Sequence, residues 1–375
     1  MRARRPSALV VTVVHHPQDA RIRHRQIPAL LAAGWDVTFV APFGGYDLPV
    51  PTPLRSGSGE LRCLDVPRAV GRRRGRALAA ARRTVRTLGA RHDVVLVHDP
   101  ELLLALPRSL YGRSVWDVHE DTAAAVVAKP WLPGPARAAS AAAVRRVERW
   151  AERHLTLLLA EYGYRDRFTR DHVVVPNTVP VPTAVPPPGD ERVVYLGTLT
   201  LERGAEEVVE TGRLLRERTG GAVVTHVLGP AHGPAGPVVR AAHERGDVHW
   251  HGFVPNDRAR ELLTGALAGL SLLRDLPNYR HSMPTKVLEY MAHGVPVVTT
   301  PLPLAEEVVT AAGSGVVVPF TDPDAAAQQI LALREDAARA AALGAAGHLA
   351  ARERYDWATV SGDFVAELTR VAGVR

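Results

Sequence analysis

The sequence predicts an α/β protein built from two doubly wound parallel sheets, each forming a Rossmann-like domain. Short runs rich in Val, Leu and Ile alternate along the chain with longer Ala-, Arg- and Leu-rich stretches. The runs lack alternating polar positions, which indicates strands buried on both faces of a sheet that helices cover. The pattern occurs twice, on either side of a proline-rich stretch at 176–191. Proline continues neither a helix nor a central strand, so this stretch predicts a boundary between domains.

The predicted strands follow one another in a regular order. In the first half they are ALVVTVV (8–14), DVTFVAP (36–42), DVVLVHD (93–99), SVWDVHE (114–120), LTLLLA (155–160) and HVVVPN (172–177). In the second half they are RVVYLG (192–197), AVVTHVLG (222–229), DVHWHGFV (247–254), GLSLL (269–273), VPVVTT (295–300) and SGVVVPF (314–320). We predict an N-terminal domain over 1–180, a linker over 181–191 and a C-terminal domain over 192–355. Residues 356–375 are predicted to form a helix that packs back toward the N-terminal domain.

Side chains that follow a predicted strand are the candidate site residues. Ligands of doubly wound sheets bind beyond the carboxyl ends of the strands, where the strand order switches, and two facing domains would create a cleft. The candidates are His15 to Ala20, His98, Asp99, His119, Glu120, Asp121, Gly197, Gly229, His251, Gly252, Phe253, Thr299 and Thr300. No G-x-G-x-x-G follows the first strand and no G-x-x-x-x-G-K-[ST] occurs. A dinucleotide oxidoreductase and a P-loop nucleotidase are therefore disfavoured.

The stretch 281–300, HSMPTKVLEYMAHGVPVVTT, predicts a helix that starts at Pro284 and ends at Gly294, before a buried strand. The free N–H groups at the start of this helix predict a phosphate site, to which Lys286 adds a positive charge. Glu289, one turn further on, could accept hydrogen bonds from the two hydroxyls of a ribose. The alternative is that Lys286 and Glu289 form a plain surface pair at i, i+3.

Composition excludes several classes of protein. Of the 46 basic residues of the 375-residue chain, 44 are Arg and two are Lys, so the net charge of +7 reflects an arginine bias. Aromatic residues make up 5% of the sequence, which leaves little material for stacking on bases. We therefore expect no nucleic-acid partner. The single cysteine, Cys63, excludes an intramolecular disulfide and suits the cytosol.

Localisation follows from the apolar runs. The N-terminal run stops at His15 without a small-residue cleavage site, and no stretch approaches the roughly 20 apolar residues that span a bilayer. We expect a cytoplasmic protein with a peripheral contact at the inner face of the plasma membrane. Within 71–89, Arg72, Arg76, Arg83 and Arg86 share one helical face, which could contact anionic lipid. The alternative is a solvated face in an arginine-rich protein.

The 16 histidines raise the question of a metal site. The sequence has no H-E-x-x-H, and His249 and His251 are interpreted as pointing to alternate sides of their strand. We therefore predict no metal site and no cofactor.

The motif PTKVLEYMAHGVPVV (284–298) closely resembles the donor-binding signature of retaining, family-4-type glycosyltransferases of the GT-B fold. VVYLGTLTLERGAEEVVE (193–210) resembles the first strand and loop of that family's C-terminal domain. VHWHGFVPNDRARELL (248–263) resembles the segment against which the nucleotide base lies. The segments HPQDARIRHRQIPALLAAGWDVTFVAP (16–42) and SVWDVHED (114–121) resemble a bacterial polysaccharide subgroup, so the likeness covers nearly the whole chain.

The resemblance implies roles for individual residues. It implies that His119 faces the transferred sugar and that Arg203 and Lys286 neutralise the donor diphosphate, so these three form the predicted catalytic set. The implied donor-binding residues are Gly197, Thr198, Gly229, His251, Phe253, His281, Ser282, Met283, Pro284, Thr285 and Glu289. The implied acceptor-binding residues are Asp19, His98 and Glu120. The donor would be a UDP- or GDP-linked sugar, and the acceptor a lipid-linked or small-molecule hydroxyl.

The sequence departs from the family pattern at three places. His281 stands where the family often has a Glu, eight residues before Glu289, which puts the usual contact with the sugar hydroxyls in doubt. Thr198 stands where an Arg often follows the glycine. The paired glycines of the first N-terminal loop are replaced by QDAR (18–21). Asp19 in this loop either contacts a substrate or caps the helix that begins at Arg21.

The expected reaction is a metal-independent, retaining transfer of a hexose-type sugar in polysaccharide, glycolipid or other glycoconjugate biosynthesis. Metal independence is expected because Arg203, Lys286 and a helix N-terminus are predicted to converge at the donor diphosphate. Three alternatives stay open: tailoring of a small-molecule natural product, epimerisation of a nucleotide sugar on the same fold, and a non-catalytic scaffold. The sugar, the base, the acceptor and the oligomeric state cannot be deduced from the sequence.

Overall fold

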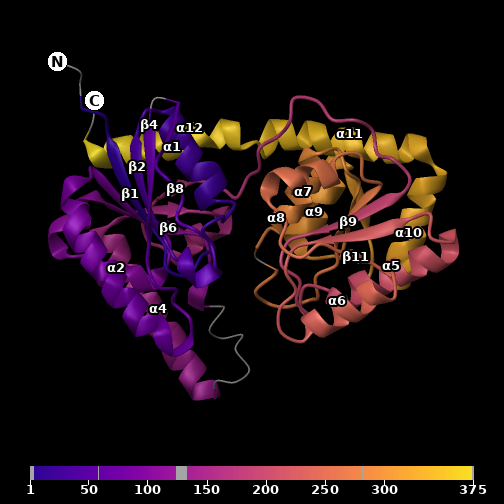
Figure 1. Cartoon of the computed structure of the whole chain (residues 1–375), viewed down its shortest axis with the longest axis horizontal. Helices are drawn as coiled ribbons and strands as arrows, with labels where there is room; N and C mark the ends of the chain where they lie inside the picture. Colours follow the sequence, from indigo (N-terminus) through magenta and orange to yellow (C-terminus); the bar gives the residue numbers. More distant parts are fainter. Residues whose placement is uncertain (1–3, 58, 124–132, 281, 374–375) are drawn as a thin grey trace. The chain divides into compact units, whose positions relative to one another are not determined.

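The computed structural model describes residues 4–57, 59–123, 133–280 and 282–373 (Figure 1). The chain divides into two compact units, one formed by Met1–Asn177 with Ala358–Arg375 and the other by Thr178–Trp357. Both units are α/β, each with its own sheet and its own buried apolar core. Among the described residues, no helix has both the length and the apolar character needed to span a bilayer.

The first unit contains an eight-stranded sheet in the order β3-β4-β2-β1-β5-β6-β7-β8. All neighbouring strands are parallel except the pair β3 and β4. The order switches between β1 and β5, which pair with each other. The strands are β1 (Ser7–Val11), β2 (Asp36–Ala41), β3 (Leu54–Ser56), β4 (Gly59–Asp65), β5 (Val94–Val97), β6 (Ser114–Val118), β7 (Thr156–Leu159) and β8 (Val173–Val174).

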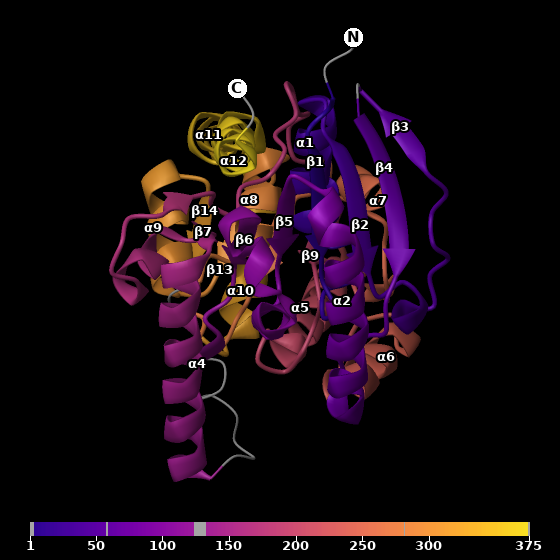
Figure 2. The ribbon, with the colours of Figure 1, turned by 90° about the vertical axis from the view of Figure 1, so that its left-hand side faces the viewer.

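Within the described ranges, the α-helices of the first unit are α1 (Ile27–Ala32), α2 (Arg74–Leu88), α4 (Gly134–His154) and, from Ala358 on, α12 (Trp357–Ala372). A π-helical turn, η1 (Ile22–Gln26), leads into α1. The connection from β5 to β6 contains two short 3₁₀ helices, η5 (Pro100–Ala105) and η6 (Arg108–Arg113). Figure 2 shows α2 and α4 as two long, separate helices. The remaining 3₁₀ helices are η2 (Gly44–Tyr46), η3 (Gly71–Arg73), η4 (Gly89–Arg91) and η7 (Tyr162–Arg167).

The second unit contains a six-stranded parallel sheet in the order β11-β10-β9-β12-β13-β14, which switches between β9 and β12. Its strands are β9 (Arg192–Leu196), β10 (Val224–Leu228), β11 (His249–Trp250), β12 (Ala268–Ser271), β13 (Val297–Thr299) and β14 (Gly315–Val317). Its helices are α5 (Ala205–Thr219), α6 (Ala235–Glu244), α7 (Asn256–Leu263), α8 (Thr285–Ala292), α9 (Pro303–Ala312), α10 (Pro323–Glu335) and α11 (Ala337–Arg354).

Two parts of the chain differ from the sequence-based picture. The predicted linker at 181–191 belongs to the second unit. There Gly189 N donates to the Gly265 carbonyl at 3.0 Å, and Arg334 Nε donates to the Asp190 carbonyl at 3.2 Å. Strands β3 and β4 were not predicted. In β4 the buried residues Leu61 and Cys63 alternate with half-buried or exposed ones, which is the pattern of a strand near the edge of a sheet.

Candidate functional site

The loop between β9 and α5 lies at the switch point of the second sheet, where doubly wound folds bind ligands. Gly197 directly follows β9 with a φ of 108° and lies beside Gly229, which directly follows β10 with a φ of 143°. A Cβ atom on Gly229 would lie 2.2 Å from the Gly197 carbonyl oxygen. Both positions therefore require glycine, and the backbone stays bare at the predicted phosphate path.

Helix α8 is fixed beside this loop by one buried side chain. The Tyr290 hydroxyl accepts a hydrogen bond from Leu196 N at 2.9 Å and donates to the Leu270 carbonyl at 3.0 Å. Its ring packs on Gly269, where a Cβ atom would come within 2.4 Å. Tyr290 thereby connects α8 to β9 and β12, the two strands at the switch point. The N-terminus of α8, capped by Pro284, is held at that point.

Lys286 and Glu289 are both buried, with 9% of each residue exposed. The interpretation of the two as a surface pair is therefore wrong. The Lys286 ammonium lies 3.8 Å from the ring centroid of Tyr195, and Nζ has no hydrogen-bond partner among the described residues. Burial, assisted by the charge of Arg203, holds the pKa of Lys286 well below its usual value. A buried cation without a partner carries an unfavourable desolvation energy that an anionic ligand would offset.

Arg203 lies in the same loop as Gly197. Its Nη1 donates to the Thr198 carbonyl at 3.3 Å, and its own N–H donates to the Thr200 carbonyl at 3.1 Å. Gly204 follows with a φ of 82° and caps α5. The structure thus brings together Gly197, Thr198, Gly229, Arg203 and Lys286, as predicted from the sequence.

The other predicted donor residues lie at two places. Met283 packs against the apolar core around α8, and Ser282 N donates to the Tyr279 carbonyl. Phe253, 53% exposed, follows β11 near His251. His281 lies outside the described residues.

The histidines around β11 form a cluster, and the prediction that they point to alternate sides is wrong. His249 and His251 are two residues apart in an extended segment and so share one face, with ring centroids 4.4 Å apart. His226, on β10, joins them through a 3.0 Å contact between its Nδ1 and His251 Nε2. Burial and the neighbouring imidazoles lower the pKa of His226 to about 4, so the ring is neutral at pH 7.

A second polar cluster lies at the switch point of the first sheet, between β1 and β5. Asp99 accepts hydrogen bonds from Thr12 Oγ1 at 3.0 Å and from Val14 N at 3.2 Å. His15 Nε2 lies 3.2 Å from Asp99 Oδ1. Burial by itself lowers the pKa of His15, but Asp99, together with the charges of Asp19 and Glu120, outweighs it and raises the pKa to about 9. His15 is therefore an imidazolium at pH 7.

Asp117, at the end of β6, is the buried centre of this cluster. Its carboxylate accepts two hydrogen bonds from Arg21, both of 2.7 Å, and one from Gln26 Nε2 at 2.9 Å. His98 Nδ1 lies 3.2 Å from Asp117 Oδ2, although its N–H is not aligned for a hydrogen bond. Burial alone would raise the pKa of Asp117, but the Arg21 guanidinium holds it well below its usual range. The cluster fixes the chain before α1 to the end of β6.

The hydrogen bonds assign a tautomer to His119. Its Nδ1 lies 3.0 Å from the Asp117 carbonyl oxygen, which can only accept, so Nδ1 carries the proton. Its Nε2 lies 2.9 Å from His15 Nε2 and accepts the proton that the His15 imidazolium donates. Burial and the charge of His15 lower the pKa of His119. His119 is therefore a neutral ring whose Nε2 lone pair is shared with His15.

Asp19 and Glu120 border the same cluster. Asp19 Oδ1 accepts from the backbone N–H groups of Arg21 and Ile22 at 2.9 and 3.0 Å, which is the capping arrangement that the sequence left open. Its Oδ2 lies 4.0 Å from His15 Nδ1.

Among the residues that the structure describes, two groups of side chains are spaced so that each could hold one metal ion. They are His15, His119 and Glu120, and His98, Asp117 and His119. Protonated His15 and the Arg21 guanidinium already balance much of the negative charge of the carboxylates in these groups. His15 and Asp99 were candidate site residues without an assigned role, and Thr12, Arg21 and Asp117 were not candidates. The available signal was the position of Thr12 directly after β1 and of the charged Asp117 within the buried strand β6.

We expect the unfolding free energy of the first unit to fall as pH rises from 6.5 to about 9, the raised pKa of His15. Because the pKa of His15 is higher in the folded state, protonation of His15 stabilises that state. This stabilisation is complete below pH 6.5 and is lost as the pH rises above the folded-state pKa. The loss amounts to roughly 3 kcal/mol. Urea unfolding across this range should show the slope in the parent chain and in the exposed control His154→Asn, and lose it in His15→Asn. An equal slope in His15→Asn would contradict the assignment.

The comparisons with known proteins address the family and the fold. Residues 190–336 match the family of glycosyl transferases group 1. No curated protein matches the sequence. The whole chain superposes on sucrose-phosphate synthase from Thermosynechococcus elongatus with a TM-score of 0.71 and 16% identity, covering 98% of both chains.

Two further solved structures extend this likeness. WaaG, a glycosyltransferase involved in lipopolysaccharide biosynthesis, gives a TM-score of 0.69 and 15% identity over 98% of this chain and 100% of its own. Anabaena Alr3699/HepE, in complex with UDP and glucose, gives 0.67 and 13% over 97% and 100%. At such identities the likeness concerns the fold, which for the two parallel-sheet units is GT-B, as the sequence predicted.

Proposed function

Since the chain has the GT-B fold and carries a glycosyl transferases group 1 domain, we propose that it transfers a hexose-type sugar from a nucleoside diphosphate donor to a hydroxyl acceptor with retention of configuration. The reaction would serve polysaccharide, glycolipid or other glycoconjugate biosynthesis. Tailoring of a small-molecule natural product is the alternative use of the same chemistry. HepE, of the same fold, was solved with UDP and glucose, which makes UDP the first nucleotide to test.

One observation carries this proposal: the Lys286 ammonium is buried, lacks a hydrogen-bond partner among the described residues and lies at the N-terminus of α8. A helix N-terminus with a nearby cation favours phosphate. Arg203 adds a second positive charge, since it contributes to the lowered pKa of Lys286. A diphosphate would occupy this place, and its charge would restore the proton affinity of Lys286.

The same groups suit the departure of the diphosphate. Transfer breaks the bond between the anomeric carbon and the donor phosphate oxygen while the acceptor oxygen bonds to that carbon. Negative charge develops on the leaving diphosphate, where Lys286, Arg203 and the α8 N–H groups would stabilise it. The acceptor proton passes to a donor phosphate oxygen, so no protein base is needed. We assign the neutral His119 ring to the transferred sugar, and Asp19 and Glu120 to the acceptor side. The His98 side chain, predicted to bind the acceptor, is fully buried against Asp117, so we assign it to the support of the cluster.

EDTA should leave turnover nearly unchanged, because protein cations take the place of a metal at the diphosphate. The assay compares initial rates with a UDP-sugar before and after dialysis against EDTA. A complete loss that magnesium or manganese restores would contradict this expectation and direct attention to the His15 and His98 groups of possible ligands.

Replacing Glu289 should weaken donor binding and leave the fold intact. We assign the Glu289 carboxylate to the ribose hydroxyls, and charged hydrogen bonds of this kind contribute about 1.5–3 kcal/mol each. Calorimetry with UDP should show the loss in Glu289→Ala and full affinity in Glu306→Ala, a control at an exposed position on α9. Parent-like affinity in Glu289→Ala would restrict this side chain to a structural role.

A thermal-shift series with UDP, GDP and ADP tests the donor part of the proposal. A ligand that binds only the folded state raises its stability by RT ln(1 + [L]/Kd), so the preferred diphosphate gives the largest shift. We expect UDP or GDP to stabilise the parent chain. No shift with any of the three would contradict the proposed donor site.

The acceptor side of the proposal includes a membrane. The Arg72–Arg86 segment, mostly within α2, presents exposed arginines, whereas Ala77, Ala81 and Val85 are buried. We propose that this face contacts anionic lipid at the inner face of the plasma membrane, where a lipid-linked acceptor would be available.

A further inference from the structure

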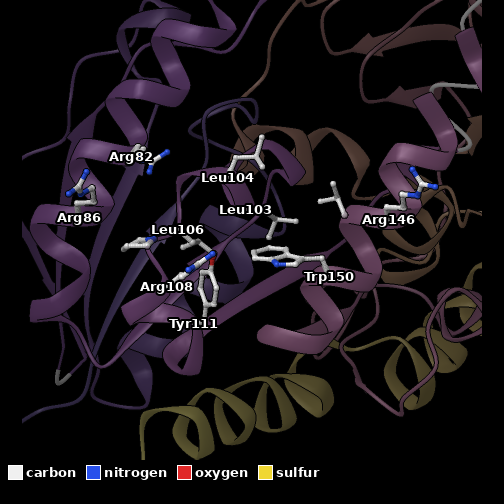
Figure 3. A pocket seen from close by; sticks show the side chains of 11 residues that line it. Arg82, Arg86, Leu103, Leu104, Leu106, Arg108, Tyr111, Arg146 and Trp150 are labelled. Atoms are coloured by element: carbon white, nitrogen blue, oxygen red, sulfur yellow. The ribbon is translucent and has the colours of Figure 1, made fainter. Parts of the chain in front are cut away.

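The first unit has a groove where its fold would ordinarily place a helix. In doubly wound sheets, helices in the crossover connections cover both faces. The crossover from β5 to β6 instead consists of η5 and η6, two short 3₁₀ helices. A cavity of about 750 Å³ lies between α2, η5, η6 and α4 (Figure 3).

The floor of this groove is apolar. Leu103 and Leu106 are buried at its base, and Trp150 lies edge-on to Tyr111 with ring centroids 5.3 Å apart. Leu104 is 61% exposed at the edge. Leu104 is exposed beside a hollow lined by Leu and Trp, so an apolar group that binds there would remove apolar surface from water, which is favourable.

The rim of the groove is cationic. Arg82 and Arg86 come from α2, Arg108 from η6 and Arg146 from α4, and all four are exposed (Figure 3). Within the described ranges, none of the four takes part in an ion pair or a side-chain hydrogen bond. Some other arginines form ion pairs, as Arg213 does with Glu210 and Glu217, and some do not, but these four surround one apolar hollow. Four unpaired guanidinium groups around one hollow therefore favour an anionic occupant.

We propose that this groove binds an anionic phospholipid of a membrane surface, with an apolar chain on the Leu103–Trp150 floor and the phosphate on the arginine rim. The basic surface continues beyond the rim through Arg76 and Arg83 on α2 and Arg149 on α4. A positive surface that extends along two helices is more complementary to the anionic surface of a membrane than to a single acidic peptide. Aromatic residues with a polar edge suit the boundary between headgroups and chains.

The test uses the full chain and vesicles, without donor or acceptor. Co-sedimentation compares phosphatidylcholine vesicles with vesicles that also contain phosphatidylglycerol. The variant R82Q/R86Q/R108Q/R146Q should lose at least about tenfold in affinity for the anionic vesicles. The control R240Q/R339Q/R352Q/R354Q removes the same charge from exposed positions of the second unit and should keep parent affinity. Equal losses in both variants, or equal binding of the parent to neutral vesicles, would overturn the proposal.

Two further arms test the apolar floor and the kind of occupant. In 1 M salt the Debye length is about 3 Å, so the vesicle binding that remains depends mainly on apolar contacts. This residual binding should be weaker in Leu104→Ser than in the parent chain. Equal residual binding would contradict the role of the apolar floor. A soluble acidic peptide should compete poorly with vesicles. Full displacement by the peptide would overturn the lipid assignment in favour of a protein partner. The inference deepens the proposed function, but vesicle binding and sugar transfer are separate readouts, so the failure of one leaves the other measurable.

Discussion

Lys286→Met is expected to make the protein more stable and to make it a poor enzyme. The ammonium is buried, lies 3.8 Å from the Tyr195 ring centroid and lacks a hydrogen-bond partner among the described side chains. Methionine of similar length would remove the desolvation energy of this cation and raise the midpoint of unfolding. Loss of a charged contact to the diphosphate should weaken donor binding by about 1.5–3 kcal/mol, which is roughly 10- to 100-fold. Turnover should fall with it.

Lys286→Arg is the matched variant that keeps the charge. The compact ammonium occupies a confined position beside Tyr195 and Arg203, and a planar guanidinium is a poor substitute for a point charge there. We expect turnover to fall more than the retained charge would suggest. Calorimetry and initial rates should be measured on both variants. Parent-like donor affinity and turnover in both would remove Lys286 from the chemistry.

Asp117→Asn should destabilise the first unit by about 3–5 kcal/mol, because it leaves the buried Arg21 guanidinium without its anionic partner. Asp117 is fully buried and accepts both Arg21 hydrogen bonds at 2.7 Å. Urea unfolding should show the change as a lower midpoint. The exposed pair Arg258–Glu261 provides the control, since Glu261→Gln should cost less than about 1 kcal/mol.

A double-mutant cycle separates this pair from general damage to the core. In the cycle Arg21→Met, Asp117→Asn and the double variant, partners in direct contact give non-additive costs. The double variant should therefore be much less destabilised than the sum of the two single variants. Additive costs would show that the pair contributes little to the stability of the first unit.

The strands buried on both faces could be predicted from the sequence because continuous Val and Leu runs leave few other structures possible. Runs such as 93–99 and 192–197 appear as β5 and β9. The β3–β4 hairpin escaped prediction because its short strands carry polar residues, with Arg62 exposed between buried Leu61 and Cys63. A strand near the edge of a sheet lacks the continuous apolar run that marks a central strand.

Helix α8 could be predicted because residues 284–298 form one continuous motif, with proline before the helix and glycine after it. The burial of Lys286 and Glu289 could not, because it depends on how Tyr290 draws α8 against β9 and β12. The polar cluster of the first unit could not be predicted without knowing the strand order. His15 and Asp99 meet only because β1 pairs with β5, and a pattern along the chain does not specify that adjacency.

The prediction that His249 and His251 point to opposite sides of their strand was wrong because side chains alternate with a period of two. Residues two apart in a strand share a face, so His249 and His251 converge, and parallel pairing then places His226 opposite His249. Both facts follow from strand geometry once the strand order is known.

Incubation of the full chain with labelled nucleotide sugars and candidate hydroxyl acceptors tests the central claim of sugar transfer most directly. We expect free nucleoside diphosphate together with a glycosylated acceptor, whose anomeric configuration, read by NMR, matches that of the donor. Transfer should fall in Lys286→Met and persist in Glu306→Ala. A new nucleotide sugar without acceptor product would instead indicate an epimerase. An unchanged donor with every acceptor and sugar would contradict catalysis and leave a scaffold that keeps the fold.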